Sequence, residues 1–344
     1  MHSRLRHALH WWCSWCDSSF ILSIIAKGYW LPWKEGVPHA FEDSNHAGVH
    51  THLDFTHGAI RDLVTSGAAV KVPTKDALMC VSPLNVVEQR HKCRLILDLR
   101  KVNNYLDIPK FKYEGLNRVA ELIRPGDWMF SIDLKSGYHH VEIHPSCWKF
   151  LGFRFEGDYY SFISLPFGLA TAPFVFTQLI KQLAKRWRAS GVRVVPYVDD
   201  LLFLYNSHSD ARSTCAAVVQ DLKAAGFVIN GKKSHLHPSR QITFLGLEID
   251  AAQGTFSVGL ERRAQLFASL QALIAQGQEG RPVPIRSLAR ITGMLASMNL
   301  ALGATALFDA FSFSWQHERG FAFPPPNLIP ATLRHAKRTH AEAL

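Results

Sequence analysis

The most informative pattern in the chain is a pair of apolar segments around two adjacent acidic residues. Aliphatic and aromatic side chains dominate residues 192–198 and 201–205, and Asp199 and Asp200 stand between them. Two such runs on either side of a short polar break indicate a β-hairpin with the aspartates at its tip. Aspartate is common in ordinary turns, so the pair also has a plain structural interpretation. Neighbouring carboxylates repel each other, however, and a half-buried pair needs either protonation or a strongly positive partner such as a divalent metal.

The hairpin is flanked by segments with regular strand and helix patterns. In chain order these are a strand over 128–133, a helix over 173–190, the hairpin, a helix over 210–225 and a short strand over 227–229. This order is that of a split β-α-β-β-α-β unit, in which the first strand lies beside the central hairpin in one antiparallel sheet. The first strand ends in a third carboxylate, Asp133. We therefore expect Asp133 to lie next to Asp199 and Asp200.

Further elements are predicted on both sides of this unit. They are a helix over 56–66, strands over 81–87, 94–99, 150–155, 159–165 and 244–249, and helices near 260–275 and 285–300. Pro83 inside the strand 81–87 indicates an edge position or a bulge. Residues 1–45 are rich in Trp and His, and we assign no chemistry to them. The tail from Pro324 onward reads as loose and basic.

Composition indicates a packed and basic intracellular protein. The chain has 344 residues, of which 47% are hydrophobic and 19% charged, and its formal net charge of +10 favours a polyanionic partner. Six scattered cysteines are typical of a reducing compartment, and the lone C-x-x-C at Cys13 and Cys16 is a weak zinc pattern. The apolar core Phe20–Ala26 is too short for a membrane helix or a signal peptide. We therefore expect a cytoplasmic or nuclear protein that is not secreted.

Three clustered carboxylates in a basic protein point to metal-dependent phosphoryl chemistry. Carboxylate oxygens suit Mg²⁺, which is held by one or two such groups together with waters and substrate phosphates. Two ions ~3.5–4 Å apart can activate an attacking hydroxyl and stabilise the leaving oxygen in an in-line displacement. Nucleotidyl transfer and nuclease chemistry both fit, whereas the chain has no EF-hand loop pattern that would support calcium storage.

Several motifs in sequence resemble those of retroelement reverse transcriptases, of the retrotransposon type. Tyr197-Val198-Asp199-Asp200 looks like their Y-x-D-D motif. The other similar blocks are a fingers block with Arg94, Asp98, Arg100 and Asn103, a first catalytic block at Ser131–His140, a second block at Leu165–Leu169 with Ala172-Pro173, a fourth block with Gly226, Asn230 and Lys233, and a primer-grip turn at Phe244-Leu245-Gly246. The similarity runs from about residue 50 to 255. The segment Arg286–Gly293 looks most like elements of the tyrosine-recombinase (DIRS) type.

The resemblance implies an α+β fold, a right-hand polymerase with a ferredoxin-like antiparallel palm, fingers and a helical thumb-like C-terminal region. The implied boundaries are an N-terminal extension at 1–45, fingers at 46–107 and 141–171, palm at 108–140 and 172–252, and the thumb-like region with its tail at 253–344. The last 90 residues hold no second acidic cluster, so we predict no RNase H activity. The unusual N-terminus and the abrupt end favour a fragment or a decayed copy of a longer polyprotein.

The resemblance also implies a role for each acidic residue. Asp133, Asp199 and Asp200 would be catalytic and would bind two Mg²⁺ ions, for which Mn²⁺ is a possible substitute. The backbone carbonyl of Leu134 would assist as a metal ligand. Within this family, the three carboxylates are therefore the residues on which the activity depends.

Nucleotide and primer would be bound by residues from the other blocks. The implied nucleotide-binding residues are Arg94, Lys92, Leu134, Tyr138, Phe167, Gly168 and Lys233, and the implied primer grip is Phe244, Leu245 and Gly246. Tyr138 occupies the position that blocks a ribose 2′-hydroxyl, which favours dNTPs. Lys233, or alternatively Lys232, would protonate the departing pyrophosphate.

The predicted function is template-directed addition of dNTPs to a primer 3′-hydroxyl. The expected partners are an RNA or DNA template with its primer duplex and dNTPs, without membrane association, and the sequence does not specify an oligomeric state. One alternative is an RNA-dependent RNA polymerase, which Tyr138 argues against. Another is a catalytically silent nucleic-acid-binding remnant of a retroelement.

Overall fold

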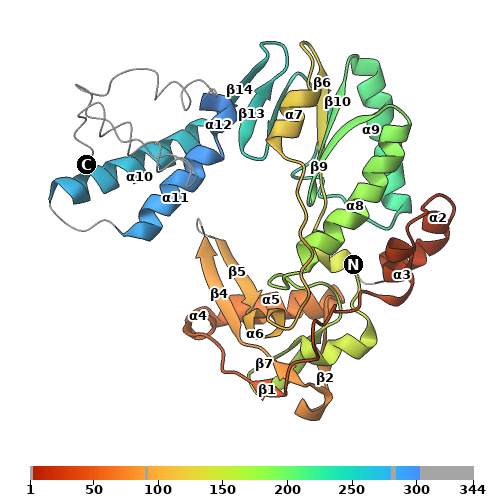
Figure 1. The fold of residues 1–344 in the computed structure, drawn as a ribbon, viewed down its shortest axis with the longest axis vertical. Coiled ribbons are helices and arrows are strands. Elements are labelled where there is room, and N and C mark those ends of the chain that lie inside the picture. Colours follow the sequence, from red (N-terminus) through yellow and green to blue (C-terminus); the bar gives the residue numbers. More distant parts are fainter. Residues whose placement is uncertain (1–2, 90–91, 280–283, 303–344) are drawn as a thin grey trace. The chain divides into compact units, whose positions relative to one another are not determined.

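The computed structural model describes residues 3–89, 92–279 and 284–302 (Figure 1). The described residues divide into two compact units, one drawn from residues 3–115 and 130–238 and the other from residues 116–129 and 239–302. The tail predicted from Pro324 onward lies outside the described residues. Within the described part of the chain, every helix is too short or too polar to cross a lipid bilayer.

The first unit is built on a four-stranded sheet of order β11-β6-β10-β9. Its strands are β6 (Trp128–Asp133), β9 (Arg193–Tyr197), β10 (Asp200–Tyr205) and β11 (His235–Ser239), and its helices are α8 (Ala172–Ala189) and α9 (His208–Ala224). The chain order is therefore β6-α8-β9-β10-α9-β11, with β6 beside the β9–β10 hairpin. The predicted split β-α-β-β-α-β arrangement is confirmed.

Aromatic side chains pack α8 onto this sheet. Phe130 of β6 stacks on Phe203 of β10 with ring centroids 4.5 Å apart, and Trp187 of α8 meets Phe203 edge-on at 5.5 Å. Each fully buried Phe or Leu contributes about 1.5–3 kcal/mol of transfer free energy. The apolar stripe of α8 is thus core, and the chain leaves the helix at Gly191, whose φ of 80° suits a glycine.

Two smaller sheets and several helices complete the first unit. A five-stranded sheet has the order β1-β3-β7-β8-β2, and β4 and β5 form a separate two-stranded hairpin. The strands are β1 (Phe41–Glu42), β2 (Ala69–Val72), β3 (Cys80–Val81), β4 (Leu84–Gln89), β5 (Lys92–Leu97), β7 (Gly152–Phe155) and β8 (Asp158–Phe162). The helices are α4 (Ala47–Thr51), α5 (Leu53–Thr65), η1 (Lys75–Ala77), α6 (Arg100–Asn103), η2 (Gly137–His140) and η3 (Pro145–Phe150).

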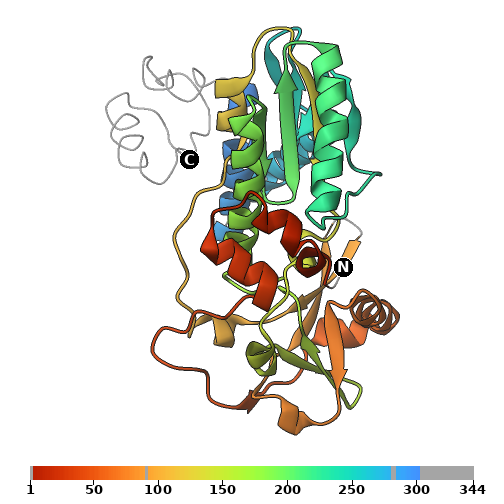
Figure 2. The same ribbon diagram turned by 90° about the vertical axis from the view of Figure 1, so that its right-hand side faces the viewer.

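The Trp-rich N-terminal segment is helical and packs on this unit. It forms α1 (Arg4–His7), α2 (Leu9–Cys13) and α3 (Ser19–Lys27), drawn in red beside α8 in Figure 2. Trp12 is fully buried, and the Arg186 guanidinium of α8 lies over the ring of Trp15 at 5.1 Å. The N-terminal segment is therefore an integral part of the first unit.

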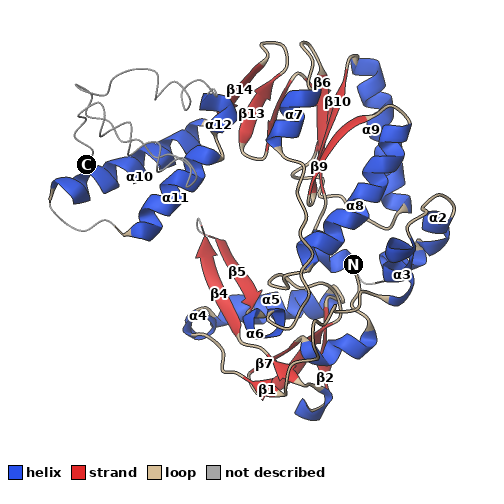
Figure 3. Cartoon of the chain, viewed as in Figure 1, coloured by secondary structure: helices blue, strands red, loops and turns tan. Residues whose placement is uncertain are grey.

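The second unit combines a three-stranded sheet with helices (Figure 3). Its elements are α7 (Leu116–Leu122), β12 (Gln241–Phe244), β13 (Leu247–Asp250), β14 (Thr255–Val258), α10 (Leu260–Gln278), α11 (Ile285–Ala296) and α12 (Asn299–Leu302). A small core joins the helices: Leu266 and Leu273 of α10 with Ile291 of α11 and Met298. The two predicted C-terminal helices are confirmed as α10 and α11.

Three predicted strands were wrong in detail. Residues 81–87 are split at Pro83 into β3 and β4, which belong to different sheets, because proline cannot donate a ladder hydrogen bond. Residues 227–229 make only an isolated bridge from Leu134 to Ile229, and the fourth strand of the central sheet is β11. Residues 244–249 are interrupted by a turn at Leu245 and Gly246, which separates β12 from β13.

Candidate active site

The tip of the β9–β10 hairpin holds two of the three predicted catalytic residues. Tyr197 pairs with Asp200 as the last rung of the ladder, so Val198 and Asp199 form a two-residue turn. Val198 has a φ of 53°, in the left-handed region that a β-branched residue strongly disfavours. Such a conformation costs about 1–3 kcal/mol and is found where the surrounding structure fixes a functional geometry. The turn is therefore held in a strained shape that presents Asp199.

The third predicted residue, Asp133, ends β6 beside this turn. The N–H of Leu134 donates a hydrogen bond to the carbonyl oxygen of Asp199 at 2.9 Å. Asp133 is largely buried, with a relative exposure of 9%. The structure thus brings Asp133, Leu134, Asp199 and Asp200 together, as the sequence predicted.

Burial and neighbouring carboxylates disfavour the charged forms of Asp199 and Asp200. Burial, reinforced by the charges of Asp199 and Asp133, raises the pKa of Asp200 to about 6. Burial and the charge of Asp133 also raise the pKa of Asp199. The ammonium of Lys233, whose Nζ lies 3.4 Å from Oδ2 of Asp133, partly offsets this repulsion. A further cation at this position would stabilise the ionised cluster.

The donor set suits a magnesium ion that is completed by substrate. Among the described residues, no three His, Cys, Asp or Glu side chains converge tightly enough to hold a metal by themselves. Mg²⁺ does not require such a cage, because it retains waters and shares its coordination with substrate phosphates. Such an ion would stabilise the charged forms of Asp199 and Asp200, which burial and neighbouring carboxylates disfavour. Asp133, Asp199 and Asp200 therefore fit the predicted Mg²⁺ ligands.

The segment after Gly226 runs along Asp133. The N–H of Asn230 donates to the carbonyl of Asp133 at 2.8 Å, and the N–H of Asp133 donates to Oγ of Ser234 at 3.0 Å. Spacing left Lys232 and Lys233 unresolved, and it is Lys233 that reaches the carboxylate. Sequence reasoning missed Ser234, for which its position directly after the two lysines was the available signal.

An aromatic cluster adjoins the acidic residues. The ring of Tyr138, in η2, lies 5.1 Å from that of Phe167 and 5.7 Å from that of Phe176. Burial raises the pKa of Tyr138, with smaller contributions from Tyr113 and Asp199, so the phenol is neutral. The backbone beside Tyr138 lies close to Asp199, since a Cβ on Gly137 would be 3.3 Å from the Cβ of Asp199.

The loop at Phe167 and Gly168 is fixed by an asparagine from α6. Asn103 donates from Nδ2 to the carbonyl of Gly168 at 2.9 Å and accepts at Oδ1 from the N–H of Ala170, also at 2.9 Å. Gly168 has a φ of 102°, and a Cβ there would lie 2.4 Å from the carbonyl oxygen of Leu97. A fingers-block residue thus sets the loop's shape, a role the sequence did not reveal.

Two further predicted nucleotide-binding residues, Arg94 and Lys92, lie on β5. Arg94 is exposed on β5, and no hydrogen bond or ion pair joins it to Asp133, Asp199 or Asp200 within the described residues. Lys92 begins the same strand, β5.

The predicted primer grip belongs to the second unit. Phe244 ends β12, and Leu245 and Gly246 form a two-residue turn with φ values of 49° and 78°. Positive φ at both positions is typical of a tight hairpin turn. Nη1 of Arg262 donates to the carbonyl of Gly246 at 2.9 Å, which braces the turn against α10.

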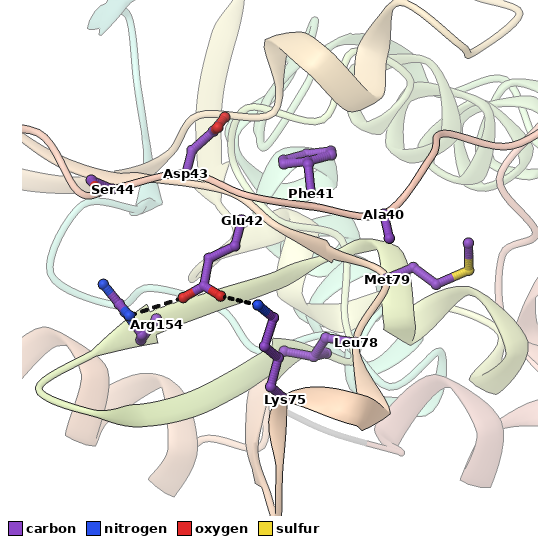
Figure 4. Close-up of a pocket in the computed structure, with 9 residues that line it drawn as sticks. All are labelled: Ala40, Phe41, Glu42, Asp43, Ser44, Lys75, Leu78, Met79 and Arg154. Carbon is purple, nitrogen blue, oxygen red and sulfur yellow. Dashed lines mark ion pairs between the residues drawn. The ribbon is translucent and has the colours of Figure 1, made fainter.

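A pocket of about 590 Å³ opens elsewhere in the first unit, between β1, η1 and β7 (Figure 4). Its half-buried carboxylate, Glu42, is held between Lys75 at 2.6 Å and Arg154 at 3.0 Å. Because these charges satisfy one another, the pocket does not compete with the carboxylate cluster as the candidate site.

Comparison of the sequence with known families decides the assignment. Residues 81–249 match the family described as "Reverse transcriptase (RNA-dependent DNA polymerase)", and this range contains all three carboxylates. The chain carries a reverse transcriptase domain. Its curated relatives include the Transposon Tf2-3 and Tf2-7 polyproteins of Schizosaccharomyces pombe, which are 26% and 24% identical over 192 residues. The retrotransposon resemblance is thereby confirmed, and the DIRS-type subfamily stays a prediction.

The match covers 56% of this chain but only 14% of each polyprotein, so the chain corresponds to a small part of these relatives. Solved structures show the same fold. A foamy viral protease-reverse transcriptase in complex with dsDNA aligns with a TM-score of 0.61 at 20% identity, covering 91% of this chain and 52% of that one. Its complex with an RNA/DNA hybrid gives 0.61 at 19%, covering 98% and 46%. The predicted α+β polymerase fold of the reverse transcriptase domain is confirmed.

Proposed function

We propose that this chain is an RNA-directed DNA polymerase that adds dNTPs to a primer 3′-hydroxyl on an RNA or DNA template. The observation that carries the proposal is the hydrogen bond from the N–H of Leu134 to the carbonyl oxygen of Asp199, which joins two strand ends and brings three carboxylates close to the half-buried Tyr138. The foamy viral relatives of the same fold are described in complex with dsDNA and with an RNA/DNA hybrid, which supports a primer–template duplex as the substrate. The net charge of +10 is consistent with a polyanionic partner.

The reaction forms a bond between the primer O3′ and the α-phosphorus of the dNTP and breaks the bond to pyrophosphate. When bound, Mg²⁺ or its expected substitute Mn²⁺ would supply positive charge at the triphosphate and at the 3′-hydroxyl. Asp133, Asp199 and Asp200 would hold the ions, with the carbonyl of Leu134 assisting. Lys233, whose Nζ lies 3.4 Å from Oδ2 of Asp133, would donate a proton to the departing pyrophosphate.

The remaining residues bind and select substrate in this proposal. Tyr138 excludes a ribose 2′-hydroxyl by its bulk. The other nucleotide contacts are Arg94, Lys92, Phe167 and Gly168, and the primer grip is Phe244, Leu245 and Gly246. Arg94 is suited to a triphosphate because its guanidinium makes paired hydrogen bonds to phosphate oxygens.

The proposed subdomains keep the boundaries expected from the motifs. They are an N-terminal extension at 1–45, fingers at 46–107 and 141–171, palm at 108–140 and 172–252, and a thumb-like region at 253–344. The expected cytoplasmic or nuclear location is part of the proposal, and it rests on the scattered cysteines of the sequence.

Primer extension by the purified chain tests the proposal. A labelled DNA primer on an RNA template, with dNTPs and Mg²⁺, should be extended by the wild type. Asp199→Asn should lower the rate at least about a hundredfold, the scale on which loss of one electrostatic group affects a transition state. Asp76→Asn, an exposed residue of η1, is the matched control and should extend normally. Undiminished extension by Asp199→Asn would refute the role of the carboxylates.

The same assay separates the two alternatives. An RNA-dependent RNA polymerase would prefer rNTPs, and Tyr138→Ala would leave that preference unchanged. If Tyr138 is the gate, Tyr138→Ala should raise rNTP incorporation about tenfold, which corresponds to ~1.4 kcal/mol of lost discrimination. A silent remnant would bind the duplex without extending it.

A further inference from the structure

The turn between α9 and the segment along Asp133 is unusually constrained. Residues 225–228 join the end of α9 to Ile229, Asn230 and Lys233. Gly226 has a φ of 92°, and a Cβ on it would lie 2.5 Å from the carbonyl oxygen of Arg4. The glycine is therefore required by the backbone of the N-terminal segment as well as by its own conformation.

Side chains of the N-terminal helices hold the carbonyls of this turn. The buried indole Nε1–H of Trp12 donates to the carbonyl oxygen of Ala225 at 3.0 Å. Nε of Arg4 donates to the carbonyl oxygen of Gly226 at 3.3 Å. The last carbonyls of a helix have no partner within the helix, so these donors satisfy groups that α9 leaves open.

His140, two residues after Tyr138, holds the C-terminal end of the 225–228 turn. Nε2 of His140 accepts from the N–H of Val228 at 3.0 Å, and its Nδ1 lies 3.1 Å from the carbonyl of Gly137. The ring of His140 also packs on Phe227, with centroids 5.2 Å apart. The turn is thus fastened to η2, which carries Tyr138.

The N-terminal helices are themselves anchored on rigid elements. Nζ of Lys185 in α8 lies 3.1 Å from Oδ2 of Asp17, and Arg186 covers the Trp15 ring. The N–H and Oγ of Ser3 donate to Oε1 of Glu142 at 2.8 and 2.9 Å. The contacts of Ser3 and Asp17 therefore fix the N-terminal helices relative to α8 and to the residues that follow η2.

We propose that α1–α3 are a positioning element of the active site, which sets the place of Lys233 by holding the 225–228 turn. Trp12 acts as the positioning residue and does not touch substrate. The predicted effect of Trp12 on the reaction rate rests on the proposed function. The predicted effect of Trp12 on the 225–228 turn does not depend on any activity.

Amide hydrogen exchange of the full chain tests whether Trp12 holds the 225–228 turn. Trp12→Phe removes the indole donor and keeps an aromatic ring. Trp15→Phe is the matched control, because Nε1 of Trp15 is buried and makes no hydrogen bond among the described residues. Trp12→Phe should speed exchange of residues 226–234 about two- to tenfold, as expected for one lost hydrogen bond. Equal exchange in the two variants would overturn the proposal.

Single-turnover primer extension tests whether Trp12 affects the reaction rate through Lys233. Trp12→Phe should lower the maximal rate about three- to tenfold with an unchanged KM for dNTP, and Trp15→Phe should resemble the wild type. In the Lys233→Gln variant, the added change Trp12→Phe should not lower the rate further. If Trp12→Phe instead lowers the rate equally in the wild-type chain and in the Lys233→Gln variant, it acts through a general loss of stability, and the inference is overturned. A wild type that extends no primer would refute the proposed function, and the exchange experiment would still decide whether α1–α3 hold the turn.

Discussion

Acid is expected to destabilise the first unit through His140. His140 has a relative exposure of 1%, and burial, assisted by the positive charge of Arg4, lowers its pKa to about 4. Protonation would also remove the acceptor that Val228 uses. An unfolded histidine titrates near 6.5, so the unfolded chain binds this proton first and stability falls as pH decreases from about 6.5 to about 4.

The magnitude follows from that difference in pKa. The full difference between pKa values of about 6.5 and about 4 corresponds to about 3 kcal/mol, and about 2 kcal/mol of it is lost by pH 5. His140→Gln keeps a donor and an acceptor but does not titrate. At pH 7 the variant should lose up to about 1 kcal/mol through imperfect hydrogen bonds. Between pH 7 and pH 5, it should gain about 2 kcal/mol relative to the wild type.

Urea unfolding followed by tryptophan fluorescence at pH 7, 6 and 5 measures this difference. Other groups that titrate in this range contribute equally to both proteins, so the comparison isolates His140. The exposed His50, changed to Gln, is the control and should follow the wild type at each pH. If the wild type and His140→Gln lose stability in parallel, the assignment of a buried neutral imidazole is wrong.

Three other predictions concern the nucleotide loop, the 225–228 turn and the metal. Asn103→Ala removes both bonds to the Gly168 loop and should raise the KM for dNTP about tenfold in steady-state extension, whereas the exposed Asn104→Ala should not. Gly226→Ala should lower the free energy of unfolding by about 1–3 kcal/mol, because its Cβ meets Arg4 at positive φ, and Gly231→Ala, with open space around it, should be near neutral in thermal unfolding. Removal of divalent ions with EDTA should stop extension, and added Mg²⁺ or Mn²⁺ should restore it; extension that persists in EDTA would contradict the proposed metal dependence.

The centre of the fold was predictable because its residues follow regular periods. The apolar stripe of α8 repeats with helical spacing, and the β9–β10 hairpin shows two uninterrupted apolar runs, so both elements were found within about a residue of their ends. Chain order then placed Asp133 beside the hairpin without any knowledge of side-chain contacts.

The errors occurred where burial does not follow such a period. β11 (His235–Ser239) is an edge strand with exposed histidines and a proline, so its composition resembles a loop, while the apolar Phe227 mimics a strand although it packs under His140. The roles of Trp12, Asn103 and Ser234 depend on partners from 67 to 213 positions away. Local pattern carries no information about such pairs.

The hydrogen bond from the indole of Trp12 to the carbonyl oxygen of Ala225 affects how the chain folds during its synthesis. The two residues are separated by 213 positions. A ribosome that adds about 5–20 residues per second needs about 10–40 s to make the intervening segment. Throughout that time the indole of Trp12 lacks its native acceptor, and the tryptophan-rich helices remain open to other apolar surfaces. The nascent chain is therefore most vulnerable to aggregation at its beginning, and translation at reduced temperature or with a chaperone that covers this segment should increase the soluble yield.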